Sequence, residues 1–126
     1  MTVVFTNGCF DIIHRGHVEL LRYCHSLGRV VVGLNSDRSV KQLKGESRPY
    51  NNESDRLLIL EACRFVDEVL IFDEETPYEL IKNIKPDIVV KGGDYQIEDV
   101  VGNDLADVKI FNFVDGYSTT NILEKM

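Results

Sequence analysis

Two histidines with helical spacing, His14 and His17, follow the first apolar run of the chain and the turn residues behind it. If a helix begins near Gly16, side chains at positions i and i+3 lie on one face, so both imidazoles can point at the same ligand. The first turn of a helix also presents free N–H groups and a positive dipole end, which favour a phosphate. Gly8, a few residues earlier, allows the main chain to approach that ligand closely. The pair therefore predicts a phosphate site.

Three other groups of residues fit the same chemistry. Gly92 and Gly93 offer a second point of close backbone approach. Lys44 and Arg48 bring positive charge within a polar segment of an acidic chain. A second phosphate-binding site is predicted at the start of a later helix, where three consecutive residues carry hydroxyl groups: Ser118, Thr119 and Thr120.

Other interpretations of the two histidines remain open on the residues alone. Zinc binding by His14 and His17 needs a third ligand, for which Cys9 and Asp11 are near in sequence. Two surface histidines at a helix start are the other alternative, and His25 is expected to be a surface residue of that kind. A P-loop is excluded because no Gly-Lys-Ser/Thr follows the first glycine, and a dinucleotide fingerprint is excluded because G-x-G-x-x-G is missing.

Strand and helix patterns alternate along the chain. Short apolar runs predict five strands, at 2–6, 29–34, 68–72, 87–91 and 108–113. Helical spacing and caps predict helices at 16–28, 53–65, 76–84 and 118–126, with a weaker helical piece within 97–106. The polar segment 37–52 is predicted to be a long loop whose first residues are compatible with a helix, and long loops often bind ligands.

This alternation indicates parallel β-α-β units wound right-handedly. The expected fold is α/β, a doubly wound parallel five-stranded sheet in a three-layer α/β/α sandwich, with residues 1–126 forming a single domain. Ligands of such sheets bind outside the carboxyl ends of the strands, where the strand order reverses. Since the residues singled out above follow strand ends, we expect them to face one crevice. Asp37, after the second strand, resembles a ribose-binding acid.

Composition excludes several classes of protein. The net charge of −7 argues against nucleic acid or an anionic membrane as partner, since both need a clustered basic surface. No apolar run approaches the roughly 18 residues of a membrane span, and no leader-like stretch opens the chain, so a cytoplasmic location is expected. Three cysteines without a C-x-x-C pair indicate reduced thiols rather than a disulfide framework.

Three motifs carry a resemblance to a known family. The stretch TNGCFDIIHRGH (6–17) resembles the signature of the HxGH nucleotidyltransferases, a cytidylyltransferase-like family with a Rossmann-like sheet. The later stretches KGGDY (91–95) and DGYSTTNI (115–122) match the family's other motifs in the same order. The resemblance covers essentially the whole chain. Within the family, segments 35–51 and 111–126 are most similar to the D-glycero-β-D-manno-heptose 1-phosphate adenylyltransferase branch.

The resemblance implies nucleotidyl transfer from a nucleoside triphosphate to a sugar phosphate, with pyrophosphate as the second product. It implies catalytic roles for His14, His17, Lys44 and Thr119, and acceptor contacts from Asp37, Lys44, Arg48 and Arg56. The nucleotide-binding positions that it implies are those matching the family motifs: Thr6, Gly8, Cys9, Phe10, Asp11, Gly16, Lys91, Gly92, Gly93, Asp94, Gly116, Ser118, Thr119 and Thr120. Mg²⁺ is expected to arrive on the triphosphate without a cage of protein side chains. A homodimer is carried over from the relatives.

Departures from the family bear on the substrates. Glycerol-3-phosphate cytidylyltransferases carry an arginine where this chain has Phe113 and a lysine where it has Glu46. Loss of these two charges favours ATP over CTP, and transfer of CTP to glycerol 3-phosphate stays as the alternative. The heptose branch is often fused to a sugar kinase, which these 126 residues do not contain. A nucleotide-binding module without turnover and a flavodoxin-like redox protein are the alternatives from other classes.

Overall fold

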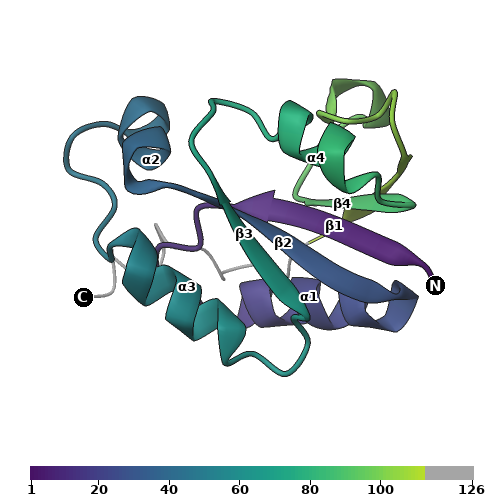
Figure 1. Ribbon diagram of the computed structural model, residues 1–126, viewed down its shortest axis with the longest axis horizontal. Helices are drawn as coiled ribbons and strands as arrows, with labels where there is room; N and C mark the ends of the chain where they lie inside the picture. Colours follow the sequence, from purple (N-terminus) through teal and green to yellow (C-terminus); the bar gives the residue numbers. More distant parts are fainter. Residues whose placement is uncertain (113–126) are drawn as a thin grey trace.

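In the computed structural model, which describes residues 1–112, five strands form one parallel sheet (Figure 1). The strands are β1 (Val3–Gly8), β2 (Arg29–Asn35), β3 (Glu68–Phe72), β4 (Ile88–Gly92) and β5 (Asp107–Phe111). Their order across the sheet is β3-β2-β1-β4-β5. The winding therefore reverses between β1 and β4, which is where ligands of such sheets bind. The prediction of a Rossmann-like doubly wound sheet is confirmed.

Helices cover both faces of this sheet. They are α1 (Arg15–Leu27), α2 (Asp37–Lys44), α3 (Glu53–Glu61) and α4 (Tyr78–Ile84), followed by the single 3-10 turn η1 (Ile97–Asp99). In Figure 1, α1 and α3 lie on one face of the sheet and α4 lies on the other, while α2 extends from the carboxyl edge. This gives the three layers that the sequence predicts.

Two apolar cores explain why the central strands are continuous hydrophobic runs. Successive residues of a strand point to opposite faces, so strands covered on both sides bury every residue. The core under α1 and α3 is built around these buried residues: Val4, Leu20, Leu21, Cys24, Val30, Val32, Leu34, Leu60 and Val90. The core under α4 is built around Phe5, Val31, Ile81, Val89 and Val100. The strand ends that carry the candidate site are therefore held rigidly.

The observed elements differ from the prediction in four details. The polar segment 37–52 is half helix, because Ser36 caps α2 by accepting a hydrogen bond from the Ser39 N–H at 3.1 Å. The helix predicted at 53–65 ends at Glu61, and within 97–106 only η1 is helical. β1 extends to Gly8, so Asn7 and Gly8 belong to the strand rather than to a turn. The helix predicted at 118–126 lies outside the described residues.

Within residues 1–112, no helix has the length and apolar character that crossing a membrane requires.

Candidate active site

A pocket of about 130 Å³ lies at the reversal point between β1 and β4. Residues from the β1 end, α1, the end of α2 and the β4 end line it: Asn7, Gly8, Cys9, Phe10, Asp11, His17, Leu20, Lys44, Lys91 and Gly92. Eight of these ten are positions that the sequence singled out. Asn7 and Leu20 are the two that it missed. The pocket therefore brings together predicted residues from the ends of β1 and β4, while Asp37 and Arg48 do not line it.

His14 and His17 form a reciprocal cap at the first turn of α1. The His14 Nδ1 accepts a hydrogen bond from the Gly16 N–H at 3.1 Å, and the His17 Nδ1 accepts one from the His14 N–H at 3.2 Å. The two rings stack with centroids 3.9 Å apart. This is the geometry of a capping box, with imidazoles in the places usually taken by a Ser or Thr and a Glu or Gln.

The capping bonds determine which ring nitrogen carries the proton. A nitrogen that accepts from a backbone N–H is unprotonated, so in the neutral ring the proton lies on Nε2. Both His14 and His17 therefore keep an Nε2–H donor that the cap does not use. Sequence spacing predicted that the two side chains share a face, and the structure adds that their donors are in a defined tautomer.

Burial lowers the pKa of both rings and so favours their neutral form. Burial lowers the pKa of His14 below its usual value. The pKa of His17 is lowered to about 4, first by burial and then by His14 and Lys44. Neutral imidazole is the form that the capping bonds require. The pair thus acts as two uncharged hydrogen-bond donors at a helix N-terminus, where the dipole and free N–H groups already favour an anion.

The loop between β1 and α1 turns sharply at Phe10. This residue has a φ of 46°, a left-handed conformation that is costly for a side chain other than glycine. Its ring lies against Gly8, where an added Cβ would be 3.1 Å from the Phe10 Cε2, and 5.2 Å from the His17 ring. Gly8 is therefore required for the close packing of the loop, in addition to any approach to a ligand.

Two lysines bring positive charge to the pocket from different elements. Lys44 is the last residue of α2, and Lys91 lies near the end of β4 with its Nζ 4.9 Å from the centre of the Tyr95 ring. Burial raises the pKa of the Cys9 thiol between them, while Lys44, Arg56 and Lys91 act to lower it. The charges that reach Cys9 are thus mostly positive, as a phosphate site needs.

Asp11, predicted to contact the nucleotide, is used inside the protein. Its carboxylate is 3% exposed and accepts hydrogen bonds from the Tyr50 N–H at 2.9 Å and the Asn51 N–H at 2.8 Å. Arg48, predicted to contact the acceptor, has its Nη1 3.8 Å from Asp11 and its guanidinium carbon 4.7 Å from the Tyr50 ring centre. In this structure both side chains hold the segment between α2 and α3.

Arg56 and Asp37 form an ion pair behind the pocket. The Arg56 Nη2 lies 2.8 Å from the Asp37 Oδ1, and Nη1 donates to the carbonyl oxygens of Cys9 and Asn35 at 2.8 and 2.7 Å. The Arg56 side chain is fully buried. This arginine therefore reaches the ends of β1 and β2 from α3, and its contacts with protein groups support the loop rather than a ligand.

The remaining predicted residues divide into those placed near the pocket and those outside the described part of the chain. Gly93 has a φ of 115° and follows the pocket residue Gly92, while Asp94 is exposed beside it. Thr6 is 1% exposed, and its Oγ1 is buried without a hydrogen-bond partner among the described residues. Gly116, Ser118, Thr119 and Thr120 lie outside residues 1–112, so their predicted roles stay predictions.

The zinc interpretation of His14 and His17 finds no support in the contacts. Among the described residues, no three His, Cys, Asp or Glu side chains group as metal ligands. The carboxylate of Asp11, the nearest acid in sequence, accepts backbone N–H groups, and Nδ1 of each histidine accepts another.

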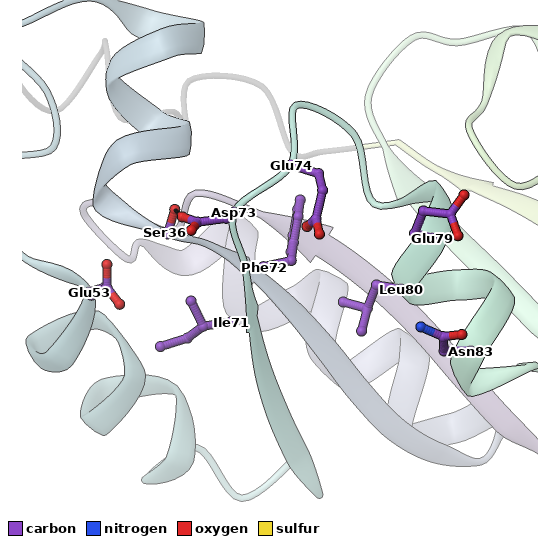
Figure 2. A pocket seen from close by; sticks show the side chains of 9 residues that line it. All are labelled: Ser36, Glu53, Ile71, Phe72, Asp73, Glu74, Glu79, Leu80 and Asn83. Atoms are coloured by element: carbon purple, nitrogen blue, oxygen red, sulfur yellow. Dashed lines mark hydrogen bonds between the residues drawn. The ribbon is translucent and has the colours of Figure 1, made fainter.

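A second pocket, of about 400 Å³, opens beside β3 and α4 at the same edge of the sheet. Figure 2 shows its lining, with Glu79 and Asn83 on α4 and Ser36 directed at Asp73, to which it donates a hydrogen bond. Glu53 and Glu74 add to the negative charge. This pocket is larger than the first, yet its acidic lining does not suit a phosphate.

Comparisons with known proteins agree with this geometry. The Cytidylyltransferase-like family matches residues 5–125. The bifunctional protein HldE of Aliarcobacter butzleri (strain RM4018) is 60% identical over 98% of this chain and 26% of its own length. HldE of Campylobacter fetus subsp. fetus (strain 82-40) is 58% identical over 99% of this chain and 28% of its own length. The chain thus spans about a quarter of the curated relatives that it matches.

A solved structure extends the likeness to three dimensions. The lipopolysaccharide core biosynthesis protein from Thermoplasma volcanium GSS1 is 27% identical, with a TM-score of 0.75 over 94% of this chain and 99% of that one. The family resemblance inferred from the motifs is therefore confirmed. With the family match over nearly its whole length, this chain belongs to the cytidylyltransferase-like family.

Proposed function

We propose that this chain transfers a nucleotidyl group from a nucleoside triphosphate, preferably ATP, to a sugar phosphate and releases pyrophosphate. The observation that carries this proposal is the histidine cap. It leaves two neutral Nε2–H donors at the N-terminus of α1, and His17 lines the same pocket as Lys44 and Lys91. Family membership and the high identity with HldE proteins favour the same reaction class.

The reaction needs positioning and charge neutralisation more than it needs a base. An oxygen of the sugar phosphate attacks the α-phosphorus in line, a new P–O bond forms, and the bond from the α-phosphorus to the bridging oxygen of pyrophosphate breaks. The nucleophile is already ionised, so no proton has to be removed. Donors preorganised toward the charge that develops in the transition state supply most of the acceleration in such reactions.

Each element of the pocket has a role in this proposal. The histidine donors and the α1 N-terminus stabilise charge on the transferred and departing phosphates. Lys44 and Lys91 neutralise the triphosphate from α2 and β4, and the main chain at Gly8 and Gly92 allows its close approach. Ser118, Thr119 and Thr120 remain proposed ligands of the β- and γ-phosphates, with Gly116 before them. Mg²⁺ is proposed to enter bound to the triphosphate.

D-glycero-β-D-manno-heptose 1-phosphate is the acceptor that we propose. The motif resemblance to the heptose branch and the identity with HldE proteins support it. The description of the Thermoplasma relative as a lipopolysaccharide core biosynthesis protein is compatible with a sugar of that kind. The HldE relatives do not favour the glycerol 3-phosphate alternative. We further propose that residues 1–126 act as one domain, as a homodimer and in the cytoplasm.

Pyrophosphate release tests the reaction and both substrates together. ATP, CTP, GTP and UTP are each combined with heptose 1-phosphate, glycerol 3-phosphate and other sugar or polyol phosphates. We expect the highest kcat/KM with ATP and the heptose phosphate. A higher kcat/KM with CTP would promote the cytidylyl alternative. Nucleotide binding without pyrophosphate release from any pair would make the chain a binding module instead.

A further inference from the structure

The segment between α2 and α3, residues 45–52, is attached through Asn51 to the β1–α1 loop, residues 9–14 (the phosphate loop). The Asn51 Nδ2 donates to the main-chain oxygen of Asp11 at 2.6 Å, and its main-chain N–H donates to the Asp11 carboxylate at 2.8 Å. Its main-chain oxygen accepts from the Arg56 Nε at 2.9 Å. One residue thus joins the β1–α1 loop, the segment 45–52 and α3.

The partners of Asn51 are themselves immobilised. Arg56 is fully buried and also donates to the Cys9 oxygen, so it ties α3 to the same loop. Asp11 is 3% exposed, and its two carboxylate oxygens both accept from the Tyr50 N–H at 2.9 Å. Since buried polar groups that lose a partner cost more than an average hydrogen bond contributes, this cluster resists partial opening.

The attachment has a consequence for the reacting groups. Lys44 precedes the segment 45–52 and lines the pocket, while Arg48 lies inside the segment. Cys9 and Phe10, on the other side of the attachment, belong to the loop proposed to receive the nucleotide phosphates. In-line transfer is sensitive to displacements of about 1 Å between two bound reactants. The attachment therefore sets the distance between the nucleotide side of the pocket and the segment 45–52, which carries Arg48 and follows Lys44.

We propose that Asn51 is a positioning residue, which fixes the segment 45–52, with Lys44 and Arg48, against the phosphate loop so that the acceptor phosphate is aligned with the α-phosphorus. The inference rests on the proposed function, because it assigns the segment 45–52 to the acceptor side of that reaction. Asn51 touches neither substrate in this account. Its loss changes the alignment of the acceptor while the nucleotide loop, held by Arg56, keeps its shape.

Asn51→Ala removes the side-chain donor, and Asn52→Ala is the matched control. The Asn52 side chain caps α3 by accepting from the Asp55 N–H at 2.8 Å, so its loss destabilises the neighbouring position without touching the attachment. For Asn51→Ala we expect kcat/KM for the acceptor to fall by about 10-fold or more, with the nucleotide Kd changed by less than about 3-fold. For Asn52→Ala we expect kcat/KM for the acceptor within about 2-fold of the unaltered protein.

Hydrogen exchange supplies a readout that does not depend on turnover. The amides of Tyr50 and Asn51, which donate to Asp11, should exchange faster in Asn51→Ala and keep their protection in Asn52→Ala. Asn51→Asp keeps the size of the side chain but offers an acceptor, not a donor, to the Asp11 main-chain oxygen. The amides of Tyr50 and Asn51 should therefore exchange faster in this variant too, as in Asn51→Ala, and its kinetic loss should be similar. This second variant keeps the test valid if the alanine variant folds poorly.

Three results would overturn the inference. These are equal kinetic losses in Asn51→Ala and Asn52→Ala, a loss of nucleotide affinity as large as the loss in acceptor kcat/KM, and unchanged exchange at Tyr50 and Asn51. Absence of pyrophosphate release from the unaltered chain with every acceptor is a different failure, since it would remove the proposed function itself. In that case hydrogen exchange still tests the attachment. Faster exchange at Tyr50 and Asn51 in Asn51→Ala would support it, and unchanged exchange would contradict it.

Discussion

Within residues 1–112, two of the pockets at the carboxyl edge of the sheet differ in size and in the charge of their lining. The one between β1 and β4 has a volume of about 130 Å³ and is lined by Lys44 and Lys91. The one beside β3 and α4 has a volume of about 400 Å³ and carries Asp73 and Glu79 in its wall. The fold produces openings wherever strands end, so size alone does not identify the phosphate site.

The helix that adjoins each pocket explains the difference. The first turn of α1 contains no acidic residue, and its free N–H groups are organised by the cap of His14 and His17. The first turn of α4 contains Glu79, and Pro77 gives it no side-chain cap. A carboxylate at a helix N-terminus already satisfies the positive dipole end. The N-terminus of α1 thus favours an anionic ligand in the first pocket, whereas the positive end of α4 is already neutralised by Glu79 in the second.

The largest expected effect is loss of the histidine donors. We expect His14→Ala and His17→Ala each to lower kcat by about 10²–10³-fold, or roughly 3–4 kcal/mol, with nucleotide Kd changed less than tenfold. The donors act on charge that builds up only in the transition state. Because both act on the same charge, the double variant should lose less than the product of the single losses. Steady-state kinetics and equilibrium binding measure the two quantities.

His14→Ser separates catalysis from helix capping. Serine is a good N-cap residue, so this variant should keep the cap, while its side chain is too short to place a donor where Nε2 lies. We expect its kcat to be as low as that of His14→Ala. Recovery of turnover by His14→Ser would mean that His14 acts only as a cap.

A smaller effect is expected from the cation at the end of α2. Lys44→Ala should lower kcat/KM by about 10²-fold, or about 2.7 kcal/mol, with little change in the free energy of unfolding. Lys44 is exposed and contributes charge rather than packing. The matched change in the acidic pocket, Glu79→Gln, should leave kcat/KM within about 2-fold. A larger loss of kcat/KM from Glu79→Gln than from Lys44→Ala would show that the reaction takes place in the acidic pocket instead.

The pH dependence of stability should report the buried imidazole. The pKa of His17 is lowered to about 4, so between pH 6.5 and 4 the unfolded chain binds a proton that the folded chain does not. Protonation of this group therefore does not reduce the free energy of unfolding above pH 6.5. Below pH 6.5 the free energy of unfolding falls as the pH drops, by up to about 1.4 kcal/mol per pH unit. Urea unfolding at several pH values should show a weaker slope in His17→Gln than in the surface variant His25→Gln. Equal slopes would contradict the burial of a neutral His17.

Much of the fold could be predicted from the sequence because its strands are apolar runs between clear helix patterns. Buried strands such as β2 leave little ambiguity, because its central residues 30–34 form an unbroken run without polar side chains. For segment 37–52 the sequence indicated a loop with a helix-compatible start, and α2 extends that start to Lys44. Its local signals were Ser36, a good cap before an acidic first turn, and the helical spacing of Val40 and Leu43 in a short, mostly polar stretch.

The sequence predicted the site well for motif residues whose side chains line the pocket. It predicted less well the residues that hold the surrounding loops through hydrogen bonds to the backbone. His17 and Lys44, which the sequence had singled out separately, both line the pocket. The sequence did not reveal that Asp11 and Arg56 bind backbone groups, because Asp11 is 40 residues from Asn51 and Arg56 is 47 residues from Cys9. Asn7 carried a usable signal, as a polar residue at the end of a buried strand just before the glycine. Asn51 carried none.

Nitrogen-15 NMR of the histidine side chains tests the central claim, that neutral donors at the α1 cap receive the triphosphate. At pH 7 the account predicts unprotonated Nδ1 and protonated Nε2 in both His14 and His17, because Nδ1 accepts a backbone N–H in each. Addition of ATP with Mg²⁺ should shift both Nε2 resonances and leave those of His25 in place. Protonated Nδ1 in either ring, or Nε2 resonances that do not respond to the nucleotide, would contradict it.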